Sequence, residues 1–166
     1  MSHKLEFLAG DFVVYPAHGV GRVEGVETHR IAGQEVTLYA ITFEKERMTL
    51  KVPVAKAKNS GLRRLSSKDR IKVALETLQG RSRVRRTMWS RRAQEYEAKI
   101  NSGDPVSIAE VVRDLYRGGD QCDQSYSERQ IYQAALERLA RELAAVEKID
   151  ESKATERLEQ VLTKAA

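Results

Sequence analysis

The hydrophobic periodicity of the chain changes near residue 60, and this change constrains the fold more than any other sequence feature. Before residue 60, short runs of β-branched and aromatic residues alternate with turn residues, as in strands. After residue 60, apolar residues recur at spacings of three and four, as on one face of a helix. Each period suits one kind of element only, so we predict a strand-rich part followed by a helical part.

Four or five short strands are expected in the first part. The candidate segments are residues 11–16, 20–31, 35–43 and 48–54. We expect bends or bulges at Gly21 and Gly25 and a turn at Ala32-Gly33. The last segment alternates, with Met48, Leu50, Val52 and Val54 on one face and Thr49, Lys51 and Pro53 on the other. Pro53 has no N–H group, so this strand should lie at an edge or end in a bulge.

Five helices are expected in the second part. Their apolar stripes contain, in chain order, Ile71, Ala74, Leu75 and Leu78; Trp89, Ala93, Tyr96 and Ile100; Ile108, Val111, Val112 and Leu115; Tyr132, Leu136, Leu139, Leu143 and Val146; and Leu158, Val161 and Leu162. Ser107 with Glu110 and Ser127 with Gln130 match the capping-box pattern, so we expect them to begin the third and fourth helices. The stripes predict a compact five-helix bundle.

The two parts together predict an α+β protein with two domains. The first, residues 1–60, is a small bent antiparallel β-sheet or barrel, and the second, residues 61–166, is the bundle. Residues 56–65 are polar and contain Asn59-Ser60-Gly61, which is typical of a linker.

Composition argues against several classes of function. The 166 residues include one cysteine, which cannot form an intramolecular disulfide or a Cys/His zinc site, so no metal or cofactor is expected. No apolar run approaches the roughly 20 residues that span a bilayer, so we expect a cytoplasmic protein. Phosphate-loop, zinc-protease and nucleophile-elbow motifs are absent from the sequence, and catalysis is not expected.

The positive charge is concentrated in the middle of the chain. The net charge of +5 divides into +1 for residues 1–60, +8 for residues 61–100 and −4 for residues 101–166. Six arginines fall within residues 81–92 without an acidic residue: Arg81, Arg83, Arg85, Arg86, Arg91 and Arg92. Such a block can neutralise phosphates and release counterions, although a solvated helical face is an equally good explanation of the charge alone.

Trp89, the only tryptophan, lies within this basic block. An aromatic side chain among arginines can stack on a base or wedge between base pairs. The helical spacing of Trp89 with Ala93, Tyr96 and Ile100 points instead to the core of the bundle, and on spacing alone the core is favoured.

Four segments in order resemble the CarD/CdnL family of bacterial transcription regulators. They are Gly10-Asp11-Phe12-Val13-Val14-Tyr15-Pro16-Ala17-His18-Gly19-Val20-Gly21, Leu50-Lys51-Val52-Pro53, Trp89-Ser90-Arg91-Arg92 and Ala109-Glu110-Val111-Val112-Arg113-Asp114-Leu115. The resemblance covers almost the whole chain. The N-terminal part of the chain also resembles the polymerase-interacting module of the transcription-repair coupling factor.

The resemblance implies a Tudor-like first domain that binds the β subunit of RNA polymerase. It also implies a helical second domain that contacts promoter DNA at the upstream fork of the melted bubble, within the holoenzyme carrying the primary sigma factor. The implied DNA contacts are Trp89 as a minor-groove wedge and the neighbouring basic residues Arg85, Arg86, Arg91 and Arg92. The implied polymerase contacts are Lys51, Pro53, His29 and Arg30, where His29 stands in place of a basic family residue.

From the resemblance we expect a nucleoid-associated protein that stabilises the open promoter complex. A monomer is expected, although no sequence feature argues for it. Two alternatives remain at this stage: a general nucleic-acid-binding protein that acts without polymerase, and a protein-only adaptor in which Trp89 is buried.

Overall fold

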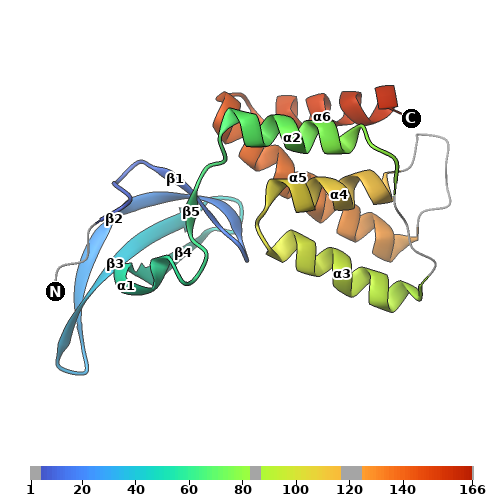
Figure 1. The fold of residues 1–166 in the computed structure, drawn as a ribbon. Helices are drawn as coiled ribbons and strands as arrows, with labels where there is room; N and C mark the ends of the chain where they lie inside the picture. The colour runs from blue at the N-terminus through green and yellow to red at the C-terminus, as the bar shows by residue number, and fades with distance from the viewer. Residues whose placement is uncertain (1–4, 83–86, 117–124, 166) are drawn as a thin grey trace. The chain divides into compact units, whose positions relative to one another are not determined.

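A computed structural model describes residues 5–82, 87–116 and 125–165 of the chain (Figure 1). The chain forms two compact units, Met1–Leu65 and Ser66–Ala166, and each is described by itself. Of the predicted site residues, Arg85 and Arg86 lie outside the described residues.

The first unit is a five-stranded antiparallel sheet in the order β4-β3-β2-β1-β5. Its strands are β1 (Phe12–Tyr15), β2 (Gly19–Ile31), β3 (Gln34–Phe43), β4 (Met48–Pro53) and β5 (Arg63–Arg64). The strand β4 lies at an edge and ends at Pro53, as its missing N–H group predicts. Because β4 pairs with β3 only as far as Leu38, β2 and β3 continue beyond it as a two-stranded ribbon (Figure 1).

One face of this sheet forms the core of the first unit. The buried side chains come from alternate positions and include Phe7, Val13, Val23, Tyr39, Ile41, Phe43 and Val52. Gly21 lies against this core, since a Cβ atom added there would stand 2.7 Å from Cε1 of Phe43. The predicted turn at Ala32-Gly33 is confirmed: both residues have positive φ, 51° and 80°, as a two-residue hairpin turn with primed geometry requires.

A β-bulge in β2 confirms the irregularity expected near Gly25. Val23 pairs with Ile41, whereas Gly25 pairs with Ala40, so one extra residue, Glu24, is accommodated between them. The extra residue reverses the alternation of β2. Residues 25, 27 and 29 therefore lie on the face of the sheet opposite to the core, together with Ala40 and Lys51.

The expected number of helices was wrong, because the described chain contains six rather than five. The additional helix is α1 (Val54–Ala57), which lies in the first unit between β4 and β5. Val54 was expected to continue the last strand, but it begins α1 instead. Pro53, with φ of −57°, is the residue before this helix, and a proline cannot donate to the ladder that a longer strand would need.

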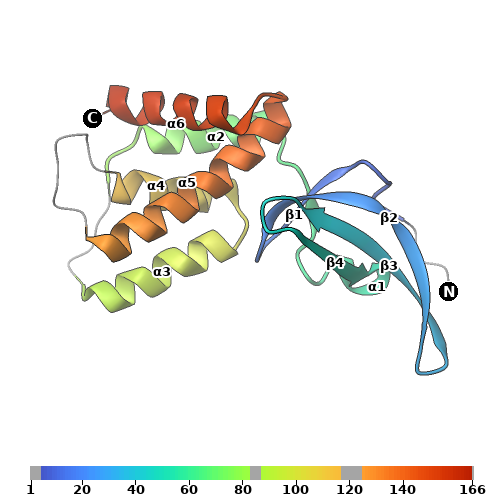
Figure 2. The same ribbon diagram turned by 180° about the vertical axis from the view of Figure 1, so that it is seen from behind.

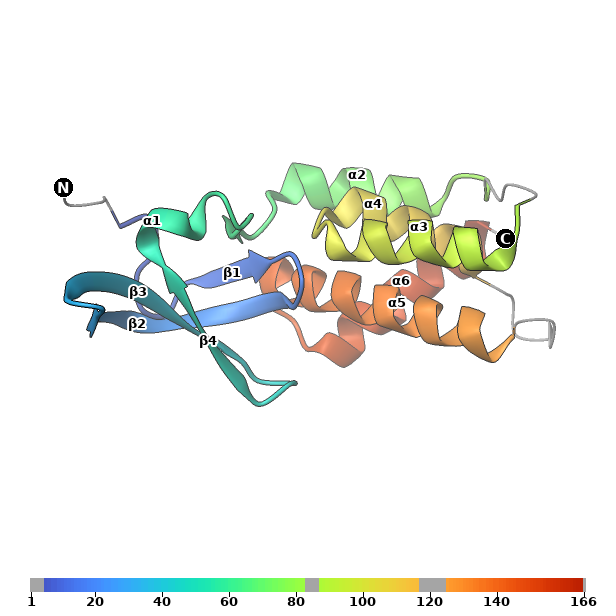
Figure 3. The same ribbon diagram turned by 90° about the horizontal axis from the view of Figure 1, so that it is seen from below.

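The second unit packs the other helices around one core. They are α2 (Lys68–Leu78), α3 (Trp89–Asn101), α4 (Pro105–Leu115), α5 (Tyr126–Glu147) and α6 (Glu151–Ala165). The helix α4 contacts α2, α3 and α5, and α6 packs against α5 and α2 (Figure 3). The predicted stripes supply most of the buried side chains, with Val111, Val112, Leu115 and Leu158 fully inaccessible to solvent.

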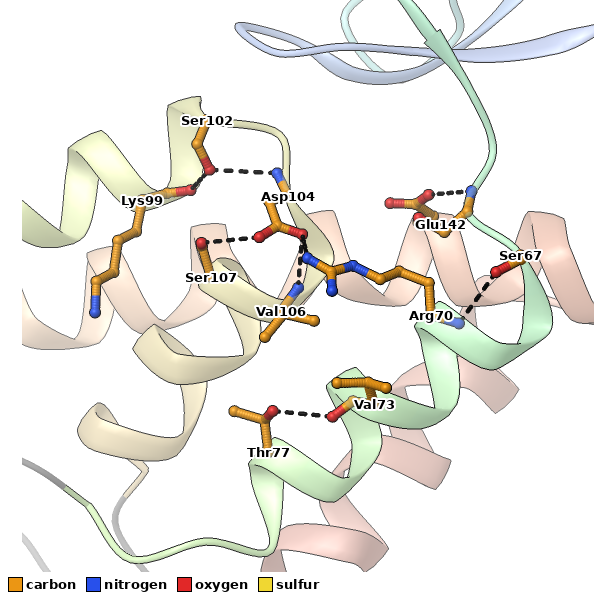
Figure 4. A network of polar contacts seen from close by, with 11 residues as sticks. Ser67, Arg70, Val73, Thr77, Lys99, Ser102, Asp104, Val106, Ser107 and Glu142 are labelled. Atoms are coloured by element: carbon orange, nitrogen blue, oxygen red, sulfur yellow. Dashed lines mark hydrogen bonds and ion pairs between the residues drawn. The ribbon is translucent and has the colours of Figure 1, made fainter.

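Both helices begin upstream of the predicted N-cap residues, Ser107 and Ser127, so these two predictions were wrong. The helix α4 begins at Pro105, and Asp104 is its N-cap: the carboxylate accepts from the Val106 N–H (3.3 Å) and from the Ser107 hydroxyl (3.1 Å; Figure 4). The helix α5 begins at Tyr126, and the Ser125 hydroxyl oxygen accepts from the Glu128 N–H (3.1 Å). A proline suits the first position of a helix, where its missing N–H would have no partner, so it moves the start of α4 upstream of Ser107.

Candidate functional site

Trp89 is the first residue of α3, at one end of the helical unit. The preceding residue, Met88, is extended, offers no side-chain cap and is 78 % exposed. The Met88 carbonyl oxygen accepts from the N–H groups of Arg91 and Arg92, both at 3.1 Å, and this begins the helix. Trp89 itself is half-buried, and its sequence neighbours Met88 and Arg91 are exposed.

The indole is anchored to the bundle as well as exposed. Its Nε1 atom donates to the Ser127 hydroxyl oxygen at 3.2 Å, and its ring centroid lies 6.2 Å from that of Tyr96. Farther along the predicted stripe, Tyr96 and Ile100 are buried in the core. Trp89 thus combines the two roles that its sequence context suggested, as an edge of the core and as a surface aromatic.

The two arginines that follow Trp89 differ in their surroundings. The Arg91 side chain is exposed. The guanidinium carbon of Arg92 lies 5.4 Å from the Trp89 ring centroid and 5.7 Å from the Tyr96 ring centroid, and an Nη2 N–H donates to the Tyr96 hydroxyl at 3.3 Å. The two arginines are equivalent in sequence, but Arg91 is exposed whereas Arg92 is partly buried.

Tyr126 is an exposed aromatic residue that sequence analysis missed. It is the first residue of α5 and is 73 % exposed. The hydrogen bond between Trp89 and Ser127 brings the N-terminal ends of α3 and α5 together, and both helices begin at the same end of the bundle (Figure 2). Placing the cap at Ser127 left Tyr126 outside the helix; the Ser125-x-x-Glu128 pattern was the signal that could have found it.

The electrostatics at this end of the bundle favour an anion. A helix N-terminus carries partial positive charge from its unpaired N–H groups, and two such ends meet here. The first turn of α3 contains Arg91 and Arg92 and no acidic residue, whereas the first turn of α5 contains Glu128. Met88, Trp89, Arg91 and Tyr126 form the candidate nucleic-acid interface of the described residues.

A second cluster lies on the sheet of the first unit, on the face opposite to its core. Glu27 Oε2 lies 3.0 Å from Lys51 Nζ and 2.8 Å from His29 Nε2. The hydrogen bond from His29, and secondarily that from Lys51, lowers the pKa of Glu27 below its usual value. The reversal of alternation at the bulge is what brings Glu27 and His29 to this face, and Glu27 was absent from the predicted site.

The other two predicted docking residues are divided between the faces. Pro53 pairs with Leu38, which pairs with Glu27, so Pro53 lies on the face of the cluster. Arg30 is exposed, but by strand alternation it lies on the opposite face from His29. Lys51, Glu27, His29 and Pro53 form the candidate docking surface.

The described ranges contain no group of three or more His, Cys, Asp or Glu side chains placed to hold a metal ion. Across the same residues, no helix is both long enough and apolar enough to cross a bilayer.

Comparison with known proteins supplies the family. The profile described as "CarD, C-terminal domain" matches residues 73–159, which is about half of the chain, and that described as "CarD-like/TRCF RID domain" matches residues 7–66. The chain belongs to the CarD family. The membership expected from the four sequence segments is thereby confirmed.

Similar proteins include a relative matched over most of the chain and two solved N-terminal domains. YdeB of Bacillus subtilis strain 168, named as a candidate transcription factor, is 30 % identical over 145 residues, which is 87 % of this chain and 95 % of YdeB. The solved N-terminal domain of CdnL from Myxococcus xanthus is 34 % identical, covers 41 % of this chain and 96 % of that domain, and has a TM-score of 0.33. The solved 72-residue N-terminal domain of Myxococcus xanthus CarD is 35 % identical, covers 38 % of this chain and 84 % of that domain, and has a TM-score of 0.32.

The CarD family consists of transcription regulators, so transcription regulation is the role of this chain. Residues 7–66 match a family of RNA polymerase-interacting domains.

Proposed function

We propose that this protein stabilises the open promoter complex by binding two targets at once. The first unit binds the β subunit of RNA polymerase through the candidate docking surface. The second unit binds the upstream fork of the melted promoter through the candidate nucleic-acid interface. Membership of the CarD family and the match of residues 7–66 to a polymerase-interacting domain support the two-target arrangement.

The position of Trp89 is the observation that carries this proposal. A large apolar ring stands half-buried at a helix start, and the neighbouring residues Met88 and Arg91 are exposed. An exposed aromatic residue costs solubility unless it has a partner, and an unstacked base step is a partner that accepts both the ring and a nearby cation. Arg91 can contact a phosphate beside the same step without reading its bases.

The wedge acts on an equilibrium between closed and open promoter DNA. Only a contact that is stronger in the open state shifts this equilibrium, and an indole can stack only where a base step is open. Stacking of an aromatic side chain on a base contributes about 1–3 kcal/mol. This corresponds to roughly a 5- to 150-fold change in the equilibrium constant.

The docking surface makes such a modest contact effective. Once the first unit is bound to polymerase, the second unit is held near the fork at a high effective concentration, so two weak contacts act as one stronger contact. Lys51 and His29 provide the basic groups of this surface, with Glu27 between them.

The decisive experiment compares Trp89→Ala with Trp89→Phe in the full chain. The lifetime of the open complex is measured after addition of a competitor, and binding to polymerase is measured separately. Trp89→Ala should shorten the lifetime and leave polymerase binding intact, whereas Trp89→Phe should retain most of the effect because it keeps an apolar ring. An unchanged lifetime for Trp89→Ala would exclude the wedge.

Affinity capture from a bacterial lysate, with and without nuclease, distinguishes the alternatives. Direct docking predicts that polymerase is recovered in both conditions. Loss of polymerase after nuclease treatment would instead favour a general nucleic-acid-binding protein. Recovery of polymerase together with a Trp89→Ala variant of full activity would favour a protein-only adaptor.

A further inference from the structure

We propose that Arg92 is a positioning residue that holds the Trp89 indole in its binding orientation, and that it is not a phosphate ligand. This inference rests on the proposed role of Trp89 at the promoter fork. It separates Arg92 from Arg91, although the two are adjacent and identical in type.

The first argument is the placement of the guanidinium group on two aromatic rings. Trp89, Arg92 and Tyr96 are spaced by three and four residues, so they share one face of α3. The Arg92 guanidinium carbon lies 5.4 Å from one ring centroid and 5.7 Å from the other, both within the range of a cation–π contact. The planar guanidinium therefore contacts both rings and links the half-buried indole to the buried Tyr96.

The second argument is how the Arg92 N–H groups are used. An Nη2 N–H donates to the Tyr96 hydroxyl at 3.3 Å, which fixes the plane of the guanidinium. The Nε atom is buried and has no acceptor among the described residues, so it faces the protein rather than a ligand in solvent. A phosphate ligand needs its fork of N–H groups directed outward, and the exposed Arg91 meets that requirement better.

The third argument is a contact at another edge of the indole. The Nε1 atom of Trp89 donates to Ser127 of α5, 38 residues away in sequence, at 3.2 Å. The ring is therefore held by its own helix through Arg92 and by a second helix through Ser127. A ring ordered before binding loses less conformational entropy on binding, so the two contacts make the wedge preorganised.

The first test uses the free protein and does not depend on DNA. Trp89 is the only tryptophan, so time-resolved fluorescence anisotropy and acrylamide quenching report on its indole alone. Arg92→Lys and Ser127→Ala should each increase the fast local rotation and the quenching of the indole, since lysine keeps the charge but cannot lie flat on both rings. Arg91→Lys, the matched control, should leave both signals unchanged. An indole in Arg92→Lys as rigid as in the wild type would overturn the proposal.

The second test measures binding to fork DNA at several salt concentrations. Arg92→Lys should weaken binding about two- to fivefold, the value of one cation–π contact, without changing the slope of log K against log salt. A phosphate ligand would behave differently: lysine would rescue it, and Arg92→Gln would flatten the slope. That pair of results would overturn the proposal.

Thermal unfolding and far-UV circular dichroism accompany each variant. If Arg92→Lys unfolds the helical unit, Arg92→Gln, which removes the cation and keeps a polar side chain, provides the same comparison of indole mobility. Increased mobility of the indole in Arg92→Lys would support the positioning role. If Trp89→Ala at the same time left the lifetime of the open complex unchanged, the proposed function would be rejected. The two failures are thus distinguishable.

Discussion

The Nζ atom of Lys51 lies 3.0 Å from the Oε2 atom of Glu27, although β3 separates their two strands. Lys51 pairs with Ala40 on β3, and Ala40 pairs with Gly25 on β2, so the residues beside Lys51 across the sheet are small. The long Lys51 side chain can therefore extend over Ala40 and reach the Glu27 carboxylate. The candidate docking surface therefore depends on a bulge, an alanine and a glycine as well as on its charged residues.

Exchange of the two charges tests the docking surface. Lys51→Glu should abolish binding of the full chain to the β subunit, because it removes the cation and places a second carboxylate beside Glu27. Lys51→Glu combined with Glu27→Lys restores an ion pair of opposite orientation and serves as the matched control for folding. Direct binding is measured with purified β subunit. If Lys51→Glu binds the β subunit with wild-type affinity, the docking surface must lie elsewhere on the first unit.

The lowered pKa of Glu27 predicts a pH dependence of the sheet. The pKa of this carboxyl is lower in the folded state than in the unfolded state, so its contribution to stability is present above the unfolded value, about 4.3, and is lost as the pH falls. Between about pH 5 and 3 the wild type should lose stability more steeply than Glu27→Gln. Urea unfolding followed by the amide signals of β2 and β3 measures this, with Glu44→Gln as the control. Equal slopes for wild type and Glu27→Gln would contradict the prediction.

Asp104 should stabilise the start of α4. Burial raises the pKa of Asp104, but the hydrogen bonds from Arg70, the Val106 N–H and Ser107 lower it by more, so the folded pKa lies below the usual value. Asp104→Ala should cost about 0.5–2 kcal/mol of unfolding free energy, the usual value of an N-cap, while the partly exposed Arg70 pair adds little. Asp104→Asn keeps a capping oxygen and should cost less. The charge-dependent difference in stability between the wild type and Asp104→Asn should begin to shrink as the pH falls through about 4, the unfolded value, and should vanish only below the lowered folded pKa.

Gly21 and Gly25 make a matched pair in the same strand. In Gly21→Ala the new Cβ would lie 2.7 Å from Cε1 of Phe43 and 2.8 Å from Cγ2 of Ile41, so overpacking should cost about 1–3 kcal/mol. In Gly25→Ala nothing lies within 4 Å of the new atom, so little change is expected. Urea unfolding of both variants measures the difference. Equal unfolding free energies would show that Phe43 and Ile41 can move away from the new Cβ without loss of stability.

Arg91 should provide a phosphate contact. Arg91→Gln should weaken fork binding and reduce the slope of log K against log salt by about 0.9 if one phosphate of a duplex is contacted. Arg157→Gln, which removes an exposed arginine from α6, is the control for net charge. A slope that changes equally in both variants would indicate a general charge effect.

Sequence by itself determined most of the elements of this protein. Alternation over residues 48–53 and the helical stripes report burial directly, because local period and burial have the same cause. The family followed from four short segments, and Trp89 was identified within the basic block. The errors were one unexpected helix, α1, which begins at Val54, and the starts of α4 and α5, where Asp104 and Ser125 replaced the expected caps. Such boundaries depend on competition between neighbouring capping groups, which composition does not resolve.

The tertiary structure decided which side chains share a site. One bulged residue in β2 placed Glu27 and His29 beside Lys51, and a count of alternating positions puts them on the other face. Arg91 and Arg92 are equivalent in sequence, but Arg92 packs on Trp89 and Tyr96, and the indole bonds to Ser127 of α5. These contacts join residues on different elements, so they arise only when the elements pack.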